Sequence, residues 1–235
     1  MIKAVLFDLD GTLLPMDQDV FIKAFSGLLA KKMVALKDYD PKQFSTAIWS
    51  AIGRIVKNDG SRSNRELWWD VYCSIMGQQA KEDEDIFLEF YKNEFQSVAD
   101  VCGYDKMAAE IIALVKEKGL RPILATNPLF PQIATASRIR WAGMQPEDFE
   151  LFTTFEDYSY CKPNLNYYLE IMEKTGLAPE ECVMVGNDVG EDMIAENLGM
   201  KVFLLTDCLI NKGEKDIFAY PQGSFSELAQ FIKEL

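Results

Sequence analysis

The sequence predicts an α/β protein: a doubly wound parallel sheet with an all-α helical insert after its first strand. Two observations predict the sheet. Short apolar runs recur along the chain, and helical patterns lie between most of them. Strands that alternate with helices form a parallel sheet that is covered on both faces. A third observation predicts the insert, because residues 17–100 carry amphipathic helical patterns and no strand pattern.

Four apolar runs are predicted to be buried strands, because they are too short for helices and rich in branched side chains. They cover residues 4–7, 122–125, 182–185 and 202–205, and a weaker fifth strand covers residues 151–153. The helices expected between and after the strands cover residues 107–118, 164–175, 191–198 and 224–233. The first of these helices carries its apolar side chains on one face and ends at Gly119.

Four stripes of apolar side chains at helical spacing fill the insert, beginning at Phe21, Phe44, Leu67 and Ile86. Pro41 fits the first turn of the second helix, and Asn64 is expected to cap the third. Core packing is the expected role of the aromatic side chains in these stripes. Phe21, Trp49 and Trp68 are also candidates for lining a cavity.

Composition excludes several classes of function. The 235 residues include 24 basic and 37 acidic side chains, for a net charge of -13. No segment concentrates lysine and arginine, so we expect no nucleic-acid partner. No apolar run approaches the roughly 20 residues that span a bilayer, so we expect no membrane partner. An anionic substrate would need a local cation in order to bind.

Histidine is absent, which excludes Ser-His and Cys-His mechanisms and zinc sites that use histidine. The five cysteines are widely spaced and form no C-x-x-C pair, so neither a disulfide framework nor a zinc site is expected. A reducing cytoplasm is therefore the expected location. A monomer is the default expectation and a dimer stays open, because the sequence reveals no extended apolar surface.

Two carboxylates, Asp8 and Asp10, follow the first predicted strand, and Gly11 and Thr12 then fit a tight turn. A strand places residues i and i+2 on the same face, so the two carboxylates lie side by side. Close carboxylates are costly unless a cation neutralises them or one of them keeps its proton. The pair therefore indicates a metal site, an acid/base pair, or both.

Further polar residues follow the later strands. Thr126 and Asn127 come directly after the second strand, where a hydroxyl and exposed backbone N–H groups suit an anionic oxygen. Lys162 precedes Pro163, which restricts the backbone of the lysine to an extended conformation and helps to fix where its ammonium group points.

The segment at residues 186–192, Gly-Asn-Asp-Val-Gly-Glu-Asp, follows the strand at 182–185. Asp188 and Asp192 share a face if a helix begins there, and the helix dipole accounts for one acidic residue at such a start. The carboxyl ends of parallel strands meet at one edge, where ligands bind. Hard oxygen ligands without histidine or thiolate fit Mg²⁺. A metal–carboxylate site with a lysine suits a phosphoryl group.

With these motifs in this order, the chain resembles the haloacid dehalogenase superfamily of hydrolases over essentially its whole length. The four family motifs are matched by Asp8-Leu-Asp10-Gly-Thr12, by Thr126, by Lys162 and by Asp188 with Asp192. The resemblance implies a Rossmann-like catalytic core made of residues 1–16 and 101–235. It also implies a helical cap domain made of residues 17–100, which closes over the active site.

The resemblance further implies a role for each motif. Asp8 would attack phosphorus and form an aspartyl-phosphate. Asp10 would protonate the leaving oxygen and then activate water. Thr126, helped by the amide of Asn127, would hold a phosphoryl oxygen, and Lys162 would neutralise Asp8 and the phosphoryl group. The expected activity is a magnesium-dependent phosphatase that acts on a small phosphorylated metabolite.

The resemblance implies that Mg²⁺ is held by Asp8, the backbone carbonyl of Asp10 and the fourth motif. Most relatives have Gly-Asp in that motif, whereas Asn187 intervenes here and leaves two registers open. Either Asp188 is the direct ligand and Asp192 a further or water-mediated one, or Asn187 takes the first position and Asp192 the second. We prefer Asp188, because a carboxylate binds Mg²⁺ better than an amide does.

Thr12 and Arg65 complete the predicted substrate contacts. Arg65 lies in a polar stretch between two helices of the insert, where it is either solvated or in contact with a distal anionic group of the substrate. Two alternative functions would use the same core, namely a sugar-phosphate mutase and a non-catalytic phospho-ligand binding protein. Asp10 weighs against dehalogenation, because the dehalogenase branch uses no second aspartate at this position.

Overall fold

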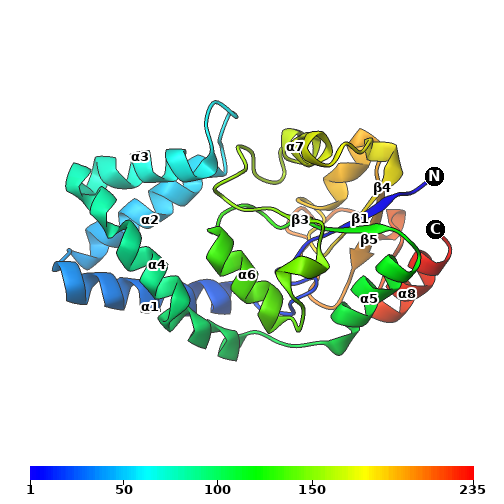
Figure 1. Ribbon diagram of the computed structural model, residues 1–235, viewed down its shortest axis with the longest axis horizontal. Coiled ribbons are helices and arrows are strands. Elements are labelled where there is room, and N and C mark those ends of the chain that lie inside the picture. Colours follow the sequence, from blue (N-terminus) through cyan, green and yellow to red (C-terminus); the bar gives the residue numbers. More distant parts are fainter.

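The computed structural model describes all 235 residues. Its centre is a sheet of six strands in the order β3-β2-β1-β4-β5-β6, and every neighbouring pair is parallel (Figure 1). The strands are β1 (Ala4–Phe7), β2 (Arg121–Leu124), β3 (Leu151–Phe152), β4 (Cys182–Gly186), β5 (Lys201–Leu205) and β6 (Gln222–Gly223). The predicted fold class is confirmed. The two-residue strand β6 is an addition, since it is too short to leave an apolar pattern.

The sheet is buried on both faces, because its central strands are apolar at successive positions. Val5 and Phe7 of β1 belong to one hydrophobic core, and Ala4 and Leu6 belong to a second core on the opposite face. Helices α5 (Lys106–Glu117), α6 (Gln132–Trp141) and α8 (Phe225–Lys233) contribute to the first core, and α7 (Leu165–Thr175) contributes to the second. Helices on both faces make the sheet doubly wound.

Between β1 and α5 the chain forms an all-helical body beside the sheet, on the left of Figure 1. It contains α1 (Gln18–Lys37), α2 (Pro41–Ile55), α3 (Asn64–Met76) and α4 (Glu84–Lys92), with 3₁₀ helices at Gln78–Asp83 and Glu94–Val101. The first hydrophobic core, which holds 44 buried residues, runs without a break from the sheet into this body. No helix of the structure combines the length and the apolar character needed to cross a bilayer.

The start of α3 differs from the prediction by one residue. Ser63, and not Asn64, is the cap: its Oγ accepts a hydrogen bond from Glu66 N (3.2 Å), and Glu66 Oε2 accepts one from Ser63 N (3.0 Å). Asn64 is instead fully buried. Its Nδ2 donates to Pro128 O (3.3 Å) and lies 3.4 Å from Cys161 Sγ, so it joins the insert to two loops of the sheet domain.

The predicted helix at 191–198 is wrong in type and length. The structure has a 3₁₀ helix at Met193–Leu198. The carboxylate of Asp188 accepts hydrogen bonds from Gly190 N (2.7 Å) and Glu191 N (3.0 Å), which holds the preceding residues in turns. Such local side-chain bonds compete with a regular helix.

Helix α6 was not predicted from the sequence. Its buried positions include polar side chains, namely Thr135, Ser137 and Arg138, so no clean apolar stripe marks it. The helix nevertheless contributes one of the charged residues of the candidate site, described below.

Candidate active site

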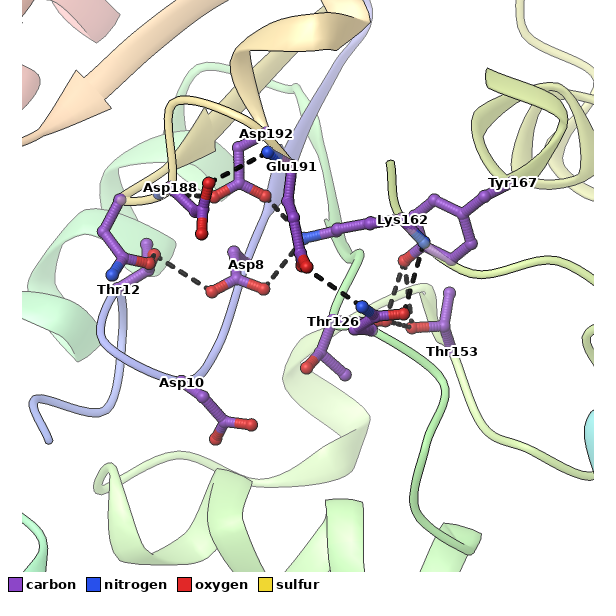
Figure 2. A network of polar contacts seen from close by, with 12 residues as sticks. Asp8, Asp10, Thr12, Thr126, Thr153, Lys162, Tyr167, Asp188, Glu191 and Asp192 are labelled. Atoms are coloured by element: carbon purple, nitrogen blue, oxygen red, sulfur yellow. Dashed lines mark hydrogen bonds and ion pairs between the residues drawn. The ribbon is translucent and has the colours of Figure 1, made fainter. Parts of the chain in front are cut away.

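A pocket of about 150 Å³ lies at the carboxyl ends of β1, β2 and β4, which are neighbours in the sheet. Figure 2 shows the polar network that surrounds it. The lining includes six predicted site residues: Asp8, Asp10, Thr126, Asn127, Asp188 and Asp192. Thr12 and Lys162 lie behind this lining and contact Asp8 directly. Topology therefore brings together residues that are far apart in the sequence.

Asp8 is the first residue after β1, and contacts on three sides fix it. Its backbone N–H donates to Val185 O on β4 (2.9 Å). Its Oδ1 accepts a hydrogen bond from Lys162 Nζ (2.8 Å). Thr12 Oγ1 lies 3.2 Å from Asp8 Oδ2 and 2.9 Å from Asn187 Oδ1, so its one proton serves these two acceptors. Thr12 thus orients Asp8 in this structure.

Lys162 is buried and bridges two carboxylates. Its Nζ donates to Asp8 Oδ1 (2.8 Å) and to Asp192 Oδ1 (2.6 Å). Burial alone would lower the pKa of this lysine, but Asp192 and Asp8 outweigh burial and raise the pKa well above its ordinary value. Asn127 Oδ1 accepts a hydrogen bond from Lys162 N (3.2 Å), which ties the lysine loop to the segment after β2. The ammonium group is therefore a fixed positive charge beside Asp8.

Asp10 is paired with Arg138, a residue that the sequence reasoning missed. Arg138 on α6 is fully buried and forms an ion pair with Asp10 Oδ2. Its guanidinium also lies 4.4 Å from the centre of the Phe130 ring, a cation–π contact that holds its plane. Asp10 Oδ1 is buried and has no hydrogen-bond partner, so one oxygen of this carboxyl group is free of hydrogen bonds. Burial raises the pKa of Asp10. The nearby carboxylate of Asp8 raises this pKa further, while Arg138 opposes the rise.

Thr126 follows β2, and its backbone is held from the side opposite the pocket. Thr126 O accepts hydrogen bonds from Thr153 Oγ1 (2.5 Å) and Tyr167 Oη (2.8 Å). The Thr126 side chain makes no hydrogen bond to these neighbours and is drawn apart from them in Figure 2. Its hydroxyl is thus available to the pocket that it lines.

Asn187, Asp188 and Asp192 of the fourth motif have different hydrogen-bond partners. Asn187 Nδ2 donates to Cys208 O (2.7 Å), while its Oδ1 faces Thr12. Asp192 is buried, and both of its oxygens are engaged, Oδ1 by Lys162 and Oδ2 by Asp188 N (2.9 Å). Gly186 allows this approach, because a Cβ there would overlap the Asp192 carboxylate. Asp188 uses Oδ1 in its own turn and keeps Oδ2 free of hydrogen bonds.

Glu191 is a second residue that the sequence reasoning left unused. Its side chain lines the pocket, and its Oε2 accepts a hydrogen bond from Asn127 Nδ2 (3.1 Å). Burial raises the pKa of this carboxyl group. Its position inside the acidic segment 186–192 was the signal that could have found it.

The oxygen donors of the site fit Mg²⁺. Five carboxylates, those of Asp8, Asp10, Asp188, Glu191 and Asp192, line the pocket, whereas only Lys162 and Arg138 form ion pairs with them, which leaves an excess of negative charge. No three acidic, cysteine or histidine side chains converge in the manner of a fully protein-ligated metal centre. Mg²⁺ normally uses one or two carboxylates together with waters and substrate phosphates. Asp188 keeps Oδ2 free, and Asp8 Oδ2 is contacted only by the Thr12 hydroxyl, whose proton also faces Asn187, so these two carboxylates meet that requirement. Asp192 does not, because Lys162 and the Asp188 N–H engage both of its oxygens.

Arg65 does not reach this pocket. Its guanidinium forms an ion pair with Glu84, and both residues line a separate apolar cavity within the insert. The predicted contact of Arg65 with an anionic group of the substrate therefore has no support in the arrangement of the site.

A family model described as a haloacid dehalogenase-like hydrolase matches residues 2–196. The chain belongs to this family. The matched region includes the segments that carry Asp8, Asp10, Thr126, Lys162 and the fourth motif, together with the helical insert. The predicted family is confirmed, and the protein is an enzyme, a haloacid dehalogenase-like hydrolase.

Relatives of this hydrolase carry the names of phosphatases. It is 27% identical to the glyceraldehyde 3-phosphate phosphatase of Methanocaldococcus jannaschii, over 100% of this chain and 99% of the relative. It is also 27% identical to the putative pyrophosphatase PpaX of Clostridium perfringens, over 86% of this chain and 82% of the relative.

Solved structures of the family share the fold. A phosphatase from Thermococcus onnurineus superposes with a TM-score of 0.61 at 19% identity and covers 98% of each chain. A 2-haloacid dehalogenase from Pseudomonas syringae superposes with a TM-score of 0.62 at 19% identity, over 100% of this chain and 99% of the other. One fold therefore serves both phosphatases and dehalogenases, and the site residues have to distinguish them.

Proposed function

We propose that this hydrolase is a magnesium-dependent phosphatase that cleaves a small phosphate monoester through an aspartyl-phosphate intermediate. One observation carries the proposal: Asp8 lies at the end of β1 with a buried lysine on one side and a second carboxyl group, Asp10, with a free oxygen on the other. This arrangement supplies a nucleophile, a charge to neutralise it and a group for proton transfer. The phosphatase names of the relatives agree with it.

In the first step, a carboxylate oxygen of Asp8 forms a bond to phosphorus while the bond from phosphorus to the alcohol oxygen breaks. Asp10 donates a proton to that departing oxygen, so the alcohol leaves in neutral form. Arg138 holds the other oxygen of Asp10. The free Oδ1 is therefore the atom we expect to carry the proton.

In the second step, Asp10 removes a proton from water as the water oxygen bonds to phosphorus. The bond between phosphorus and Asp8 breaks, inorganic phosphate leaves, and both carboxyl groups return to their starting states. Lys162 balances the charge of Asp8 in both steps, while the Thr126 hydroxyl and the amide of Asn127 bind phosphoryl oxygens. Positioning and charge neutralisation supply most of the rate in phosphoryl transfer.

We propose that Mg²⁺ is held by Asp8, the backbone carbonyl of Asp10 and Asp188. When bound, the ion supplies a Lewis acid that offsets phosphoryl charge. Asp192 serves instead to hold Lys162 in place, because both of its oxygens are engaged within the protein. This allocation favours the register in which Asp188 is the direct ligand. We further propose that residues 17–100 act as the cap that covers the pocket.

The test is phosphate release from p-nitrophenyl phosphate by the purified protein. We expect activity that requires Mg²⁺ and is abolished by a chelator. Asp8→Asn preserves the shape of the side chain and should lower kcat by about a thousandfold or more. Asp70→Asn is the matched control, because Asp70 is an exposed carboxylate on α3. An acid quench during turnover should trap phosphate on the wild type and not on Asp8→Asn.

Two results would overturn the proposal. Phosphate release by Asp8→Asn at the wild-type rate would exclude the covalent intermediate. Conversion of a sugar phosphate into its isomer without release of phosphate would identify a mutase in place of a phosphatase.

A further inference from the structure

The helical insert encloses a cavity of about 200 Å³ that the mechanism above does not use. It lies among α1, α2, α3 and α4 and is closed by two loops of the sheet domain, at residues 129–131 and 155–156. Fourteen of its eighteen lining residues are hydrophobic. A dry apolar cavity of roughly 150 Å³ in another protein is large enough to bind benzene. This cavity therefore has room for one aromatic ring or a short alkyl chain.

The cavity adjoins the catalytic pocket. Ile22, Leu129 and Phe130 line both spaces. Phe130 is also the ring on which Arg138 packs, and Arg138 holds Asp10. A ligand whose phosphoryl group lies at Asp8 would therefore have its remaining atoms on the side of Asp10, which is the side where the leaving oxygen departs.

The charged side chains around the cavity have partners within the protein. Arg65 forms an ion pair with Glu84, and Glu156 accepts hydrogen bonds from Gln132 N (3.1 and 3.0 Å). No unpaired cation is left here to bind a second phosphate or a carboxylate. Mutations in proteins show that burying a hydroxyl group without a hydrogen-bond partner costs about 1–3 kcal/mol of free energy. The lining thus disfavours diphosphates and polyols.

Three of the large hydrophobic side chains that are exposed on this protein line the same cavity. Ile22, Trp49 and Leu88 have 38%, 42% and 38% of their surface exposed. Single exposed apolar residues are ordinary, but a group of them around one cavity marks a binding surface. An apolar group in the cavity would contact these side chains where they line it.

We propose that this cavity binds the leaving group of the substrate, so that the protein acts on phosphate monoesters of an apolar or aromatic alcohol. The inference rests on the phosphatase function proposed above and specifies its substrate class. It separates this protein from the relatives named for glyceraldehyde 3-phosphate and pyrophosphate, whose substrates are small and polar.

The experiment measures kcat/KM for a series of n-alkyl phosphates from methyl to hexyl, with Mg²⁺ present. Each buried methylene contributes about 0.8 kcal/mol, so kcat/KM should rise about three- to fourfold per methylene until the cavity is filled. Propyl phosphate and glycerol 3-phosphate form a matched pair that differs by two hydroxyl groups. We expect propyl phosphate to be preferred by about tenfold or more.

Trp49→Ser tests the cavity itself. In this variant kcat/KM should rise less with alkyl chain length than in the wild type. Leu36→Ser is the control, since Leu36 is exposed on α1 and lies outside the cavity lining, and it should keep the wild-type slope. Hydrolysis without any effect of chain length, or with a preference for glycerol 3-phosphate, would overturn this inference and leave the phosphatase function standing. If p-nitrophenyl phosphate is hydrolysed and no ester of the series is, this inference alone fails; if p-nitrophenyl phosphate is not hydrolysed either, the proposed function itself fails.

Discussion

The edge of the sheet and the helical insert bury charge in opposite ways. The insert buries one charged residue, Asp83, and balances its charge: Lys37 Nζ forms an ion pair with Oδ1 at 3.0 Å, although Oδ1 accepts no hydrogen bond, and the hydroxyls of Tyr39 and Tyr72 donate to Oδ2, each at 2.9 Å. At the sheet edge, Asp8 and Asp192 share Lys162, while Asp188 and Glu191 line the same pocket without an ion pair. The difference teaches that a charge balanced by its partners supports the fold, whereas an excess of negative charge at one edge marks a candidate functional site.

Among the residues around the nucleophile, the largest effect is expected at Lys162. Lys162→Met leaves Asp8 and Asp192 facing each other without a cation, and should reduce phosphatase activity by about 10²–10³. It should also destabilise the fold by about 3–5 kcal/mol, because the buried charges lose their partner. Adding Asp192→Asn to Lys162→Met should restore part of the stability in urea titrations and none of the activity. A single Lys162→Met variant with wild-type stability would show that this charge is not needed for folding.

Arg138 should have the next largest effect. Arg138→Met removes the cation that holds Asp10 and should lower kcat by about a hundredfold, within the range of a general acid or base. The matched control is Arg140→Met on the same helix, where the side chain is exposed and activity should stay at the wild-type level. Equal losses in the two variants would mean that α6 is damaged as a whole. Circular dichroism of both variants checks that possibility.

Asp188 separates the two registers of the fourth motif. Asp188→Asn should raise the Mg²⁺ concentration for half-maximal activity by about tenfold or more, because an amide is the weaker ligand. Glu191→Gln, a neighbour that lines the same pocket, should change this concentration much less. An unchanged Mg²⁺ requirement in Asp188→Asn would favour Asn187 and Asp192 as the ligands.

The smallest effect on activity is expected at Asp83. Asp83→Ala leaves the hydroxyls of two tyrosines without an acceptor and should lower the free energy of unfolding by about 2–4 kcal/mol. Asp83→Asn keeps an acceptor oxygen and should lose less. Under conditions where both variants are folded, phosphate release from p-nitrophenyl phosphate should match the wild type. A large fall in kcat for Asp83→Asn would break the contrast between the two regions.

Much of the sheet edge could be predicted from local patterns. Asp8, Asp10, Thr126 and Asp188 follow apolar runs that are recognisable as strands, and the parallel topology brings strand ends to one edge. Arg138 could not be predicted in this way. It lies on a helix without a clear apolar stripe, and its partner Asp10 is 128 positions away. Only tertiary packing makes that pair, and no local signal accompanies it.

The helical insert shows the same limit of prediction from local sequence patterns. Its four helices were predictable from spacing, but the cavity among them depends on how their aromatic side chains meet. Trp68 and Tyr72 stack at 4.9 Å between ring centres, and Trp69 packs edge-on against both. Arg65 was predicted to be either solvated or in contact with the substrate, and its ion pair with Glu84, nineteen residues away, could not be predicted from its loop position. Helical periodicity predicts which face of each helix is buried, but it does not predict the shape of the cavity between the helices.

The bonds at the start of α3 have a consequence for the order of events in the catalytic cycle. Asn64 and Arg65 donate their backbone N–H groups to Tyr158 O and Phe155 O (both 2.8 Å), and the Asn64 side chain reaches Pro128 and Cys161. These anchors sit next to the segments that bear Asn127 and Lys162. A movement that lifted α3 to admit a phosphate ester would therefore loosen the lysine loop at the same time. Substrate entry and the chemical step would then need different conformations. Lys162 would be in place beside Asp8 only in the conformation in which α3 is anchored.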